Sequence, residues 1–120
     1  MFEKVAFTMY PVEDPVRARA FYEGTLGLTV GKHSPNGVWT EYDLPSGGCL
    51  ALFRTTDIEP SAGAGGSVAF EVDDLDVLVA RLESEGVQIK AKEIKSPVCR
   101  MSIILDSEGN SIILHQLEKK

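Results

Sequence analysis

The sequence predicts an α+β protein in which two βαβββ modules form a curved eight-stranded sheet around a cleft. The order strand, helix, strand, strand, strand can be read twice, over residues 4–54 and again over residues 67–118. The helical segment 12–23 (VEDPVRARAFYE) aligns with the segment 72–83 (VDDLDVLVARLE) at a constant offset of 60 residues. Neither half is long enough to bury its sheet well alone. We therefore expect the halves to pair as one domain of 120 residues, joined by a linker over residues 55–66.

The first module begins with a strand over residues 4–10 (KVAFTMY), which is rich in β-branched and aromatic residues. A helix follows, because Asp14 is a good N-cap and Pro15 fits the first helical position, where its missing N–H costs nothing. Gly27 can end this helix in the left-handed conformation. The three remaining strands are expected over residues 28–33, 37–44 and 49–54.

The linker, TTDIEPSAGAGG, is small, polar and rich in residues that break helices and strands. Its GAGG run (63–66) is weak as a phosphate-binding loop, because no lysine or helix start follows it. The second module then opens with a strand over residues 67–72 and a helix that begins after Asp74 and ends at Gly86. The apolar stripe of this helix consists of Leu75, Leu78, Val79 and Leu82. Three further strands are expected over residues 87–94, 99–106 and 111–117.

Charge and cysteine content restrict the partners and the compartment. The net charge is −6 and the basic residues are scattered, so we expect neither a nucleic acid nor an anionic membrane surface as a partner. No apolar run is long enough to span a bilayer, and no signal-peptide pattern is visible at the N-terminus. Two cysteines, Cys49 and Cys99, are too few for a disulfide scaffold and favour reduced thiols. The expected setting is the cytoplasm.

Three motifs carry a resemblance to a known family. The first module has a V-x-D…FY…LG helix over residues 12–27. The second has VAFEVDDLDVLVARL and then LDSEGNSIIL, a turn and strand similar to the pattern DPDGNxxEL. Their order, spacing and repetition resemble the vicinal oxygen chelate superfamily over residues 4–117, which includes glyoxalase I, extradiol dioxygenases, fosfomycin-resistance enzymes and bleomycin-resistance proteins. The resemblance implies the paired-module fold, a small-molecule ligand and a homodimer.

The resemblance also implies where a metal ion would be held. Metal-dependent members place carboxylate or histidine ligands at points that correspond here to Phe7, Ala51, Ser67 and Ile113. Phenylalanine, alanine and isoleucine offer no donor atom, and a neutral serine hydroxyl is a poor ligand for Mg²⁺, Mn²⁺, Zn²⁺ or Fe²⁺. We therefore expect no metal cofactor, and neither of the usual glyoxalase I and extradiol dioxygenase reactions, which require one. An alternative is a relocated metal site made of His115, Glu71 and Glu41, a facial set suited to Fe²⁺ or Mn²⁺.

Alternation of side chains along the strands predicts which residues line the cleft. If Ile113 faces the cleft, so do Ser111 and His115. The expected floor is made of aromatic and thioether side chains, namely Phe7, Met9, Trp39, Phe53 and Met101. Small or polar residues line it as well, and these are Cys49, Ala51, Ser67, Ala69, His115, Glu71, Glu41, Asp43 and Cys99. Mostly apolar walls with a few placed polar groups are typical of a small-molecule site.

The phase of one strand and the register of another stay open. For residues 37–44 we prefer the phase that packs Tyr42 against the helix, which sends Trp39 to the cleft. For the strand over residues 99–106, a tight turn at SEGN (107–110) places Met101 opposite His115. Arg100 then lies on the far face of the sheet, and a one-residue slip would exchange it with Met101.

His115 and Glu71 are the candidate catalytic residues. A histidine titrates near working pH and can act as a general acid or base, but a rim histidine bonded to a neighbour fits the sequence nearly as well. Glu71 on an inward face needs a ligand, water or a partner such as His115 or Arg100. Cys99 can be a nucleophile if a histidine lowers its pKa, although a buried inert thiol is the more frequent case. Trp39 can stack on a ligand or simply pack.

These observations predict metal-independent binding of a small, aromatic or cationic molecule in the cleft between the modules. The acidic candidates on the cleft face motivate the preference for a cation. The alternative is an enzyme of the lyase, isomerase or dioxygenase type. It would use His115 with Glu71 as acid and base, or the relocated metal site. His33, the second histidine of the chain, is interpreted as a loop residue.

Overall fold

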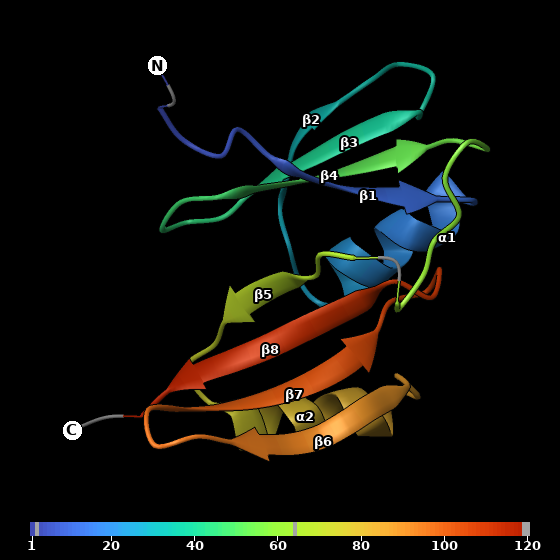
Figure 1. Cartoon of the computed structure of the whole chain (residues 1–120). Helices are drawn as coiled ribbons and strands as arrows, with labels where there is room; N and C mark the ends of the chain where they lie inside the picture. Colours follow the sequence, from blue (N-terminus) through green and yellow to red (C-terminus); the bar gives the residue numbers. More distant parts are fainter. Residues whose placement is uncertain (2, 64, 119–120) are drawn as a thin grey trace. The chain divides into compact units, whose positions relative to one another are not determined.

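The computed structural model describes residues 1, 3–63 and 65–118, and the chain divides into two compact units, Met1–Pro60 and Ser61–Lys120 (Figure 1). We call them the N-terminal unit and the C-terminal unit. The boundary between them falls inside the segment 55–66 that the sequence predicts as a linker, of which Ala64 lies outside the described residues. Among the described residues, no helix is long and apolar enough to cross a membrane.

The N-terminal unit has the element order strand, helix and three strands that the sequence predicts. Its sheet has the strand order β1-β4-β3-β2, in which β1 is parallel to β4 and the other neighbours are antiparallel. β1 is thus an edge strand, which suits Pro11 within it, because an edge tolerates a residue without an N–H. The elements are β1 (Thr8–Val12), α1 (Pro15–Arg19), the π-helix η1 (Ala20–Thr25), β2 (Val30–His33), β3 (Trp39–Asp43) and β4 (Cys49–Arg54).

The first strand lies further along the chain than the sequence predicts. The predicted range was 4–10, whereas β1 pairs only from Thr8, which lies opposite Leu50 of β4. The reason is the length of the partner, since β4 begins at Cys49, directly after two turn glycines with positive φ, Gly47 (115°) and Gly48 (93°). β4 therefore offers no strand partner to residues 4–6.

The predicted helix forms, but its second half is wound as a π-helix. Asp14 caps α1 by accepting a hydrogen bond from the backbone N–H of Arg17 (3.1 Å), and the helical path ends at Gly27 (φ 79°), as expected. In η1 the bonds skip one residue more than in an α-helix, as in the 2.9 Å bond from the Leu26 N–H to the Phe21 carbonyl.

The π-helix brings a polar network against the sheet. Tyr42 of β3 is fully buried, stacks on Tyr22 of η1 with ring centroids 5.9 Å apart, and donates its hydroxyl hydrogen bond to Glu23 (2.9 Å). Arg19 donates to the same carboxylate through Nε (2.7 Å). The Arg19 hydrogen bond lowers the pKa of Glu23, and burial raises the pKa of the Tyr42 phenol.

The C-terminal unit repeats the same topology. Its sheet has the strand order β5-β8-β7-β6, with β5 parallel to β8 and the other neighbours antiparallel, and α2 covers one face of that sheet (Figure 1). The fold class is therefore confirmed, with a four-stranded mixed sheet in each of two βαβββ modules. The elements are β5 (Val68–Glu71), α2 (Leu75–Ser84), β6 (Ile89–Lys95), β7 (Cys99–Leu105) and β8 (Ser111–Leu117).

Helix α2 begins and ends where the sequence predicts. Asp74 accepts a hydrogen bond from the N–H of Val77 (3.2 Å), and Gly86 takes the left-handed conformation (φ 83°) just after the helix. The stripe residues Leu75, Val79 and Leu82 are buried, as are the side chains of the sheet face that α2 covers, Ser102, Ile104, Ile112 and Leu114. Leu78 is only half-buried.

The turn between β7 and β8 is held by one buried carboxylate. Asp106 is 6% exposed, and its Oδ1 accepts hydrogen bonds from the backbone N–H groups of Glu108 and Asn110, both at 2.8 Å. The Asn110 side chain donates to Oδ2 (3.2 Å) and accepts from the N–H of Ser61 (3.1 Å). The turn thus fixes the position at which β8 starts.

Both open questions of strand alignment have the answer that we preferred. The side chains of Thr40 and Tyr42 are buried on the helix-covered face, so Trp39, Glu41 and Asp43 lie on the other face. In the C-terminal unit Met101 lies directly opposite His115, and Arg100 lies opposite Gln116. The tight turn at Asp106 explains this register, because a shift of β8 against β7 by one residue would need an extra residue in the turn.

We expect Glu23→Gln to lower the free energy of unfolding by about 1–2 kcal/mol, because it removes the charge from two hydrogen bonds at a partly buried carboxylate. Urea denaturation at neutral pH measures this. The folded-state pKa of Glu23 is lowered. The ionised carboxylate therefore contributes to the free energy of unfolding above the unfolded-state pKa, and this contribution is lost as pH falls through the folded-state pKa. The difference between wild type and variant should therefore shrink in acid.

The matched control is Glu85→Gln, which removes the charge from the exposed pair of Arg81 and Glu85 (2.6 Å) on α2. We expect a change below about 0.5 kcal/mol there. Equal effects of the two substitutions would contradict the importance that we assign to the Tyr42–Glu23 network.

Asp106→Ala should destabilise the chain by about 3 kcal/mol, because it leaves several buried donors of the turn without their acceptor. Thermal and urea denaturation measure the effect. Asp57→Ala, in an exposed loop, is the control and should stay within about 0.5 kcal/mol of wild type. A mild effect at Asp106 would mean that backbone bonds alone hold the turn.

Candidate functional site

The sheet of the N-terminal unit has one helix-free face, which we call the N-face. Alternation from the buried side chains of β3 and β4 assigns its residues, and the register places Trp39 beside Phe53 and Glu41 beside Ala51. Met9 of β1 lies on the other side of Ala51. The N-face carries Met9, Lys32, Trp39, Glu41, Asp43, Cys49, Ala51 and Phe53, with Phe7 directly before β1.

Three aromatic rings form a continuous cluster on the N-face. The ring centroids of Phe7 and Trp39 are 5.2 Å apart in an edge-to-face arrangement, and those of Trp39 and Phe53 are 5.8 Å apart. Phe7 is 44% exposed, and Trp39 and Phe53 are half-buried. The cluster is therefore a partly exposed apolar surface with Trp39 at its centre. A planar aromatic ligand could lie against these rings.

A carboxylate is attached to the aromatic cluster. Glu41 accepts a hydrogen bond from the indole N–H of Trp39 (2.7 Å) and a weak one from the thiol of Cys49 (3.8 Å). These donors hold the negative charge beside the edge of the indole ring. Asp43 adds a second acidic group at the exposed end of β3, where it faces Gly31 so closely that a Cβ at Gly31 would lie 2.7 Å from Asp43 Oδ2.

Cys49 is held as a neutral thiol. Its pKa is raised, first by burial and then by the negative charges of Glu41 and Asp43. The thiolate is the nucleophilic form of cysteine, so this environment disfavours reaction at Cys49.

The sheet of the C-terminal unit has a corresponding helix-free face, the C-face. The register places Ala69, Ile113 and Ile103 in one row across the strands, and Glu71, His115 and Met101 in the next. Ser67, directly before β5, is hydrogen-bonded to Ser111 between the two hydroxyl oxygens (3.1 Å). Most of the C-face is apolar, and Glu71 and His115 are its charged and titratable pair.

Glu71 and His115 are in direct contact. Nδ1 of His115 lies 2.5 Å from Oε1 of Glu71, and Oε2 accepts a hydrogen bond from the backbone N–H of Leu117 (2.9 Å). The Leu117 N–H and, after it, His115 lower the pKa of the Glu71 carboxyl. Of the two partners that the sequence suggests for Glu71, His115 is the one in contact with it, and Arg100 is not.

Arg100 and Cys99 have partners away from the Glu71–His115 pair. Arg100 lies on the helix-covered face, where it contacts Asp76 (3.1 Å) and Gln116 (3.1 Å). Cys99 is 8% exposed, and its sulfur lies 3.2 Å from the hydroxyl of Ser96. Among the described residues no histidine contacts the Cys99 sulfur, so no imidazole is placed to activate this thiol. The buried-thiol interpretation fits this environment better than the nucleophile.

The donor set at the family's metal positions does not fit a metal ion. Phe7 and Ala51 lie at the N-face and Ile113 lies on the C-face, all three without a donor atom, and the hydroxyl of Ser67 is engaged with Ser111. Within the described part of the chain, no group of three or more His, Cys, Asp or Glu side chains could hold a metal. The relocated set of His115, Glu71 and Glu41 has members in both units, and it stays a prediction.

One functional candidate was missed in the sequence. His33, interpreted there as a loop residue, ends β2, and its ring nitrogens lie 3.2 Å from Nη1 of Arg19 and 3.0 Å from the hydroxyl of Thr40. It thereby extends the network of Glu23 and Tyr42 to an open hollow lined by Pro15, Val16, Arg19, Ala20, Glu23, His33 and Gly37. The i, i+4 spacing of Arg19 and Glu23 was the available signal, but the sequence does not indicate that His33 joins them.

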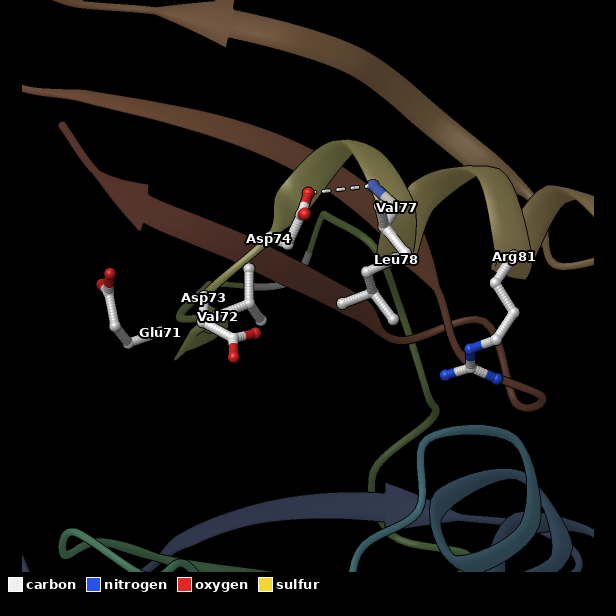
Figure 2. Close-up of a pocket in the computed structure, with 7 residues that line it drawn as sticks. All are labelled: Glu71, Val72, Asp73, Asp74, Val77, Leu78 and Arg81. Atoms are coloured by element: carbon white, nitrogen blue, oxygen red, sulfur yellow. Dashed lines mark hydrogen bonds between the residues drawn. The ribbon is translucent and has the colours of Figure 1, made fainter. Parts of the chain in front are cut away.

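A second open hollow lies where β5 leads into α2. Figure 2 shows Glu71 at one end and Arg81 at the other, with the Asp74 carboxylate directed at the N–H of Val77. Asp74 is thus occupied as the N-cap, and the remaining lining residues are Val72, Asp73 and Leu78. The hollow is open, Asp74 is taken up as the N-cap, and Arg81 is paired with Glu85 of the same helix, so we do not count it as the site.

Comparisons with known proteins agree with this architecture. A family model described as "Glyoxalase/Bleomycin resistance protein/Dioxygenase superfamily" matches residues 4–114. The solved structure of TnmS3, an antibiotic binding protein from Streptomyces sp. CB03234, is 26% identical, with a TM-score of 0.82 and 98% of each chain covered. A comparison with curated proteins gives no match.

Two further solved structures are similar over nearly the whole chain. A glyoxalase/bleomycin resistance protein from Streptomyces sp. CB03234 is 26% identical, with a TM-score of 0.76, and the match covers 92% of this chain and 97% of that one. A glyoxalase/dioxygenase from Nostoc punctiforme is 21% identical, with a TM-score of 0.80, and the match covers 97% and 92%. At that identity the second likeness concerns the fold alone.

The environment of Cys49 leads to a test of the N-face. In a Cys99→Ser background, we expect iodoacetamide to alkylate Cys49 at neutral pH more slowly than a free cysteine, because its pKa is raised. Glu41→Gln should speed the reaction, since it removes one of the charges that disfavour the thiolate, while burial keeps it slower than free cysteine. Glu59→Gln, an exposed carboxylate of the same unit, is the control. An unchanged rate in Glu41→Gln would contradict the contact of Cys49 with Glu41.

Proposed function

The chain belongs to the glyoxalase/bleomycin resistance protein/dioxygenase superfamily, and we propose that it is a metal-independent member that binds a small aromatic or cationic molecule on the N-face. The observation that carries this proposal is the cluster of Phe7, Trp39 and Phe53 with the Glu41 carboxylate at its edge. An aromatic surface with one placed polar group is the usual composition of a small-molecule site.

The aromatic part of the proposal rests on the exposure of the rings. A planar ligand that covers Phe7 and Trp39 removes apolar surface from water and gains ring–ring contact, which is worth about 0.5–1.5 kcal/mol per pair beyond the area term. The rings belong to or adjoin neighbouring strands of one sheet, so the surface needs little rearrangement before binding.

The cationic part rests on charge. Glu41 and Asp43 are both on the N-face, and the register also places Lys32 there, opposite Glu41. These three charged side chains leave the N-face with a net negative charge. A cation over an indole ring gains a cation–π interaction of about 0.5–2 kcal/mol, and the Glu41 carboxylate beside that ring favours the same charge. An aromatic anion gains the ring contacts but is repelled by both carboxylates.

The relatives support a binding role. TnmS3, 26% identical over 98% of each chain, is described as an antibiotic binding protein. We extend this to the present chain as a proposal for its ligand class, a small organic molecule held without a metal. The homodimer, the cytoplasmic setting and the absence of a nucleic-acid partner remain part of the proposal.

Planar probes of opposite charge test the proposal. We expect proflavine, a planar aromatic cation, to bind more tightly than anthraquinone-2-sulfonate, a planar anion, when both are titrated by calorimetry. Trp39→Ala should weaken proflavine binding by about 1–2 kcal/mol, which is roughly five- to thirtyfold. Glu41→Gln should weaken proflavine but leave the sulfonate unchanged or slightly tighter.

Glu59→Gln is the control for the charge effect, and a melting curve of each variant controls for folding. Titrations repeated with EDTA and with added Mn²⁺ or Zn²⁺ should give the same dissociation constants. Wild-type affinity in both Trp39→Ala and Glu41→Gln would show that the N-face is not the site, and binding that depends on a metal would refute metal independence.

Acid–base catalysis by His115 with Glu71 is the second candidate function. The observation that favours it is the short contact between Nδ1 of His115 and Oε1 of Glu71 (2.5 Å), an arrangement that can pass a proton to or from a bound molecule. Turnover would require a substrate with a labile proton within reach of the other ring nitrogen.

A further inference from the structure

The carboxylate of Glu71 is fixed at both of its oxygens. Oε1 contacts Nδ1 of His115, and Oε2 accepts the backbone N–H of Leu117. Because Glu71 and His115 are register partners on adjacent parallel strands, the sheet itself sets the distance between the two side chains. The imidazole is thus oriented by a group that is anchored to the backbone.

This contact decides the tautomer of His115. The pKa of Glu71 is lowered, so the carboxylate is ionised at neutral pH and can only accept hydrogen bonds. Nδ1 must then carry the hydrogen, and in the neutral imidazole Nε2 carries a lone pair. We assign the Nδ1–H tautomer on this ground.

The Nε2 atom has no partner of its own. Among the described residues, the only hydrogen bond of the His115 ring is the one at Nδ1, and the side chain is 26% exposed. Its neighbours on the C-face are Met101, directly opposite on β7, and Ile113, two residues back on the same strand. A lone pair amid apolar side chains needs a donor from water or from a ligand.

We propose that the C-face holds a second binding site, in which Nε2 of His115 accepts the hydrogen of a weakly acidic hydroxyl group of a ligand, a phenol or an enol. The O–H proton moves to Nε2, and its electron pair stays on the ligand oxygen, which becomes a phenolate or enolate. The resulting imidazolium is paired with the Glu71 carboxylate. Glu71 is the positioning residue of this site.

The chemistry of the pair selects this class of ligand. A neutral imidazole nitrogen takes up a proton most readily from an acidic hydroxyl group. An acidic phenol meets this condition, whereas an aliphatic alcohol is too weak an acid. A carboxylate is already ionised at neutral pH, has no proton to give, and is repelled by the charge of Glu71. Apolar contact with Met101 and Ile113 favours a ring behind the hydroxyl.

This site does not depend on the proposed function of the N-face, and one probe separates the two. The probe is 4-nitrophenol, whose own pKa lies near neutrality and whose phenolate form absorbs visible light. With the pH buffered at that pKa, we expect millimolar 4-nitrophenol to gain phenolate absorbance when wild-type protein is added. The methyl ether 4-nitroanisole, which has the same ring and no acidic proton, is expected to compete poorly.

The variants identify the proton acceptor. His115→Gln should lose the gain in phenolate absorbance, because glutamine cannot take up the proton. Glu71→Gln should reduce it, because the imidazolium then lacks its counter-charge. His33→Gln, the same substitution at the other histidine, and Trp39→Ala on the N-face should both keep it. No gain in the wild type, or an equal gain in His115→Gln, overturns the proposal.

A gain that Trp39→Ala abolishes and His115→Gln retains would also overturn this proposal, and it would leave the N-face proposal standing. A second measurement needs no ligand. Two-bond proton–nitrogen correlation spectra of protein labelled with nitrogen-15 at histidine should give the Nδ1–H tautomer for neutral His115 in the wild type. Glu71→Gln should lose this preference. The Nε2–H tautomer in the wild type would refute the assignment of Nε2 as an acceptor.

Discussion

Each sheet is covered by helical structure on one face only, and this constraint determines which side chains are left for ligands. In a strand, successive side chains point to opposite faces, so the burial of Tyr42, Leu50 and Ile112 under the helical segments fixes the direction of every other residue in those strands. Trp39 and Glu41 lie on the N-face, and His115 lies on the C-face, for this reason alone. A slip of one residue would bury Glu41 or His115 without partners, at a cost that the apolar contacts of the core could not offset.

The two units use the same topology for different chemistry. The N-face has rings and a carboxylate that receives the indole N–H of Trp39, an arrangement that suits a flat cation. The C-face has aliphatic and thioether side chains around the Glu71–His115 pair, which suits the exchange of a proton. The two faces differ in the side chains at a few corresponding strand positions. The core residues under the two sheets are similar in kind. The two binding chemistries that we propose for this chain therefore need no change in fold.

The sequence predicted the parts of this structure that follow from periodicity and caps. Asp14, Asp74, Gly27 and Gly86 each ended or began a helix where expected, since capping chemistry is local. The π-helical turn after Arg19 was not predicted, because its apolar pattern is the same as that of an α-helix. His33 was misjudged for a related reason. Its partner Arg19 is 14 residues away, and its contact with Thr40 depends on the register of β2 against β3.

The relation between the family's metal positions and the polar groups of the C-face explains why a proton fits this face better than a metal. His115 is two residues beyond Ile113, and Glu71 is four residues beyond Ser67, so all of them point to the same face of the sheet. A zinc site uses three or four protein ligands. Glu71 has one oxygen on the Leu117 N–H and the other on His115, which leaves Nε2 as the one nitrogen of the pair that faces outward without a partner among the described residues. A single oriented nitrogen beside an anchored carboxylate offers few donors to a metal and one well-placed acceptor to a proton, and this supports the proposal of a metal-independent C-face.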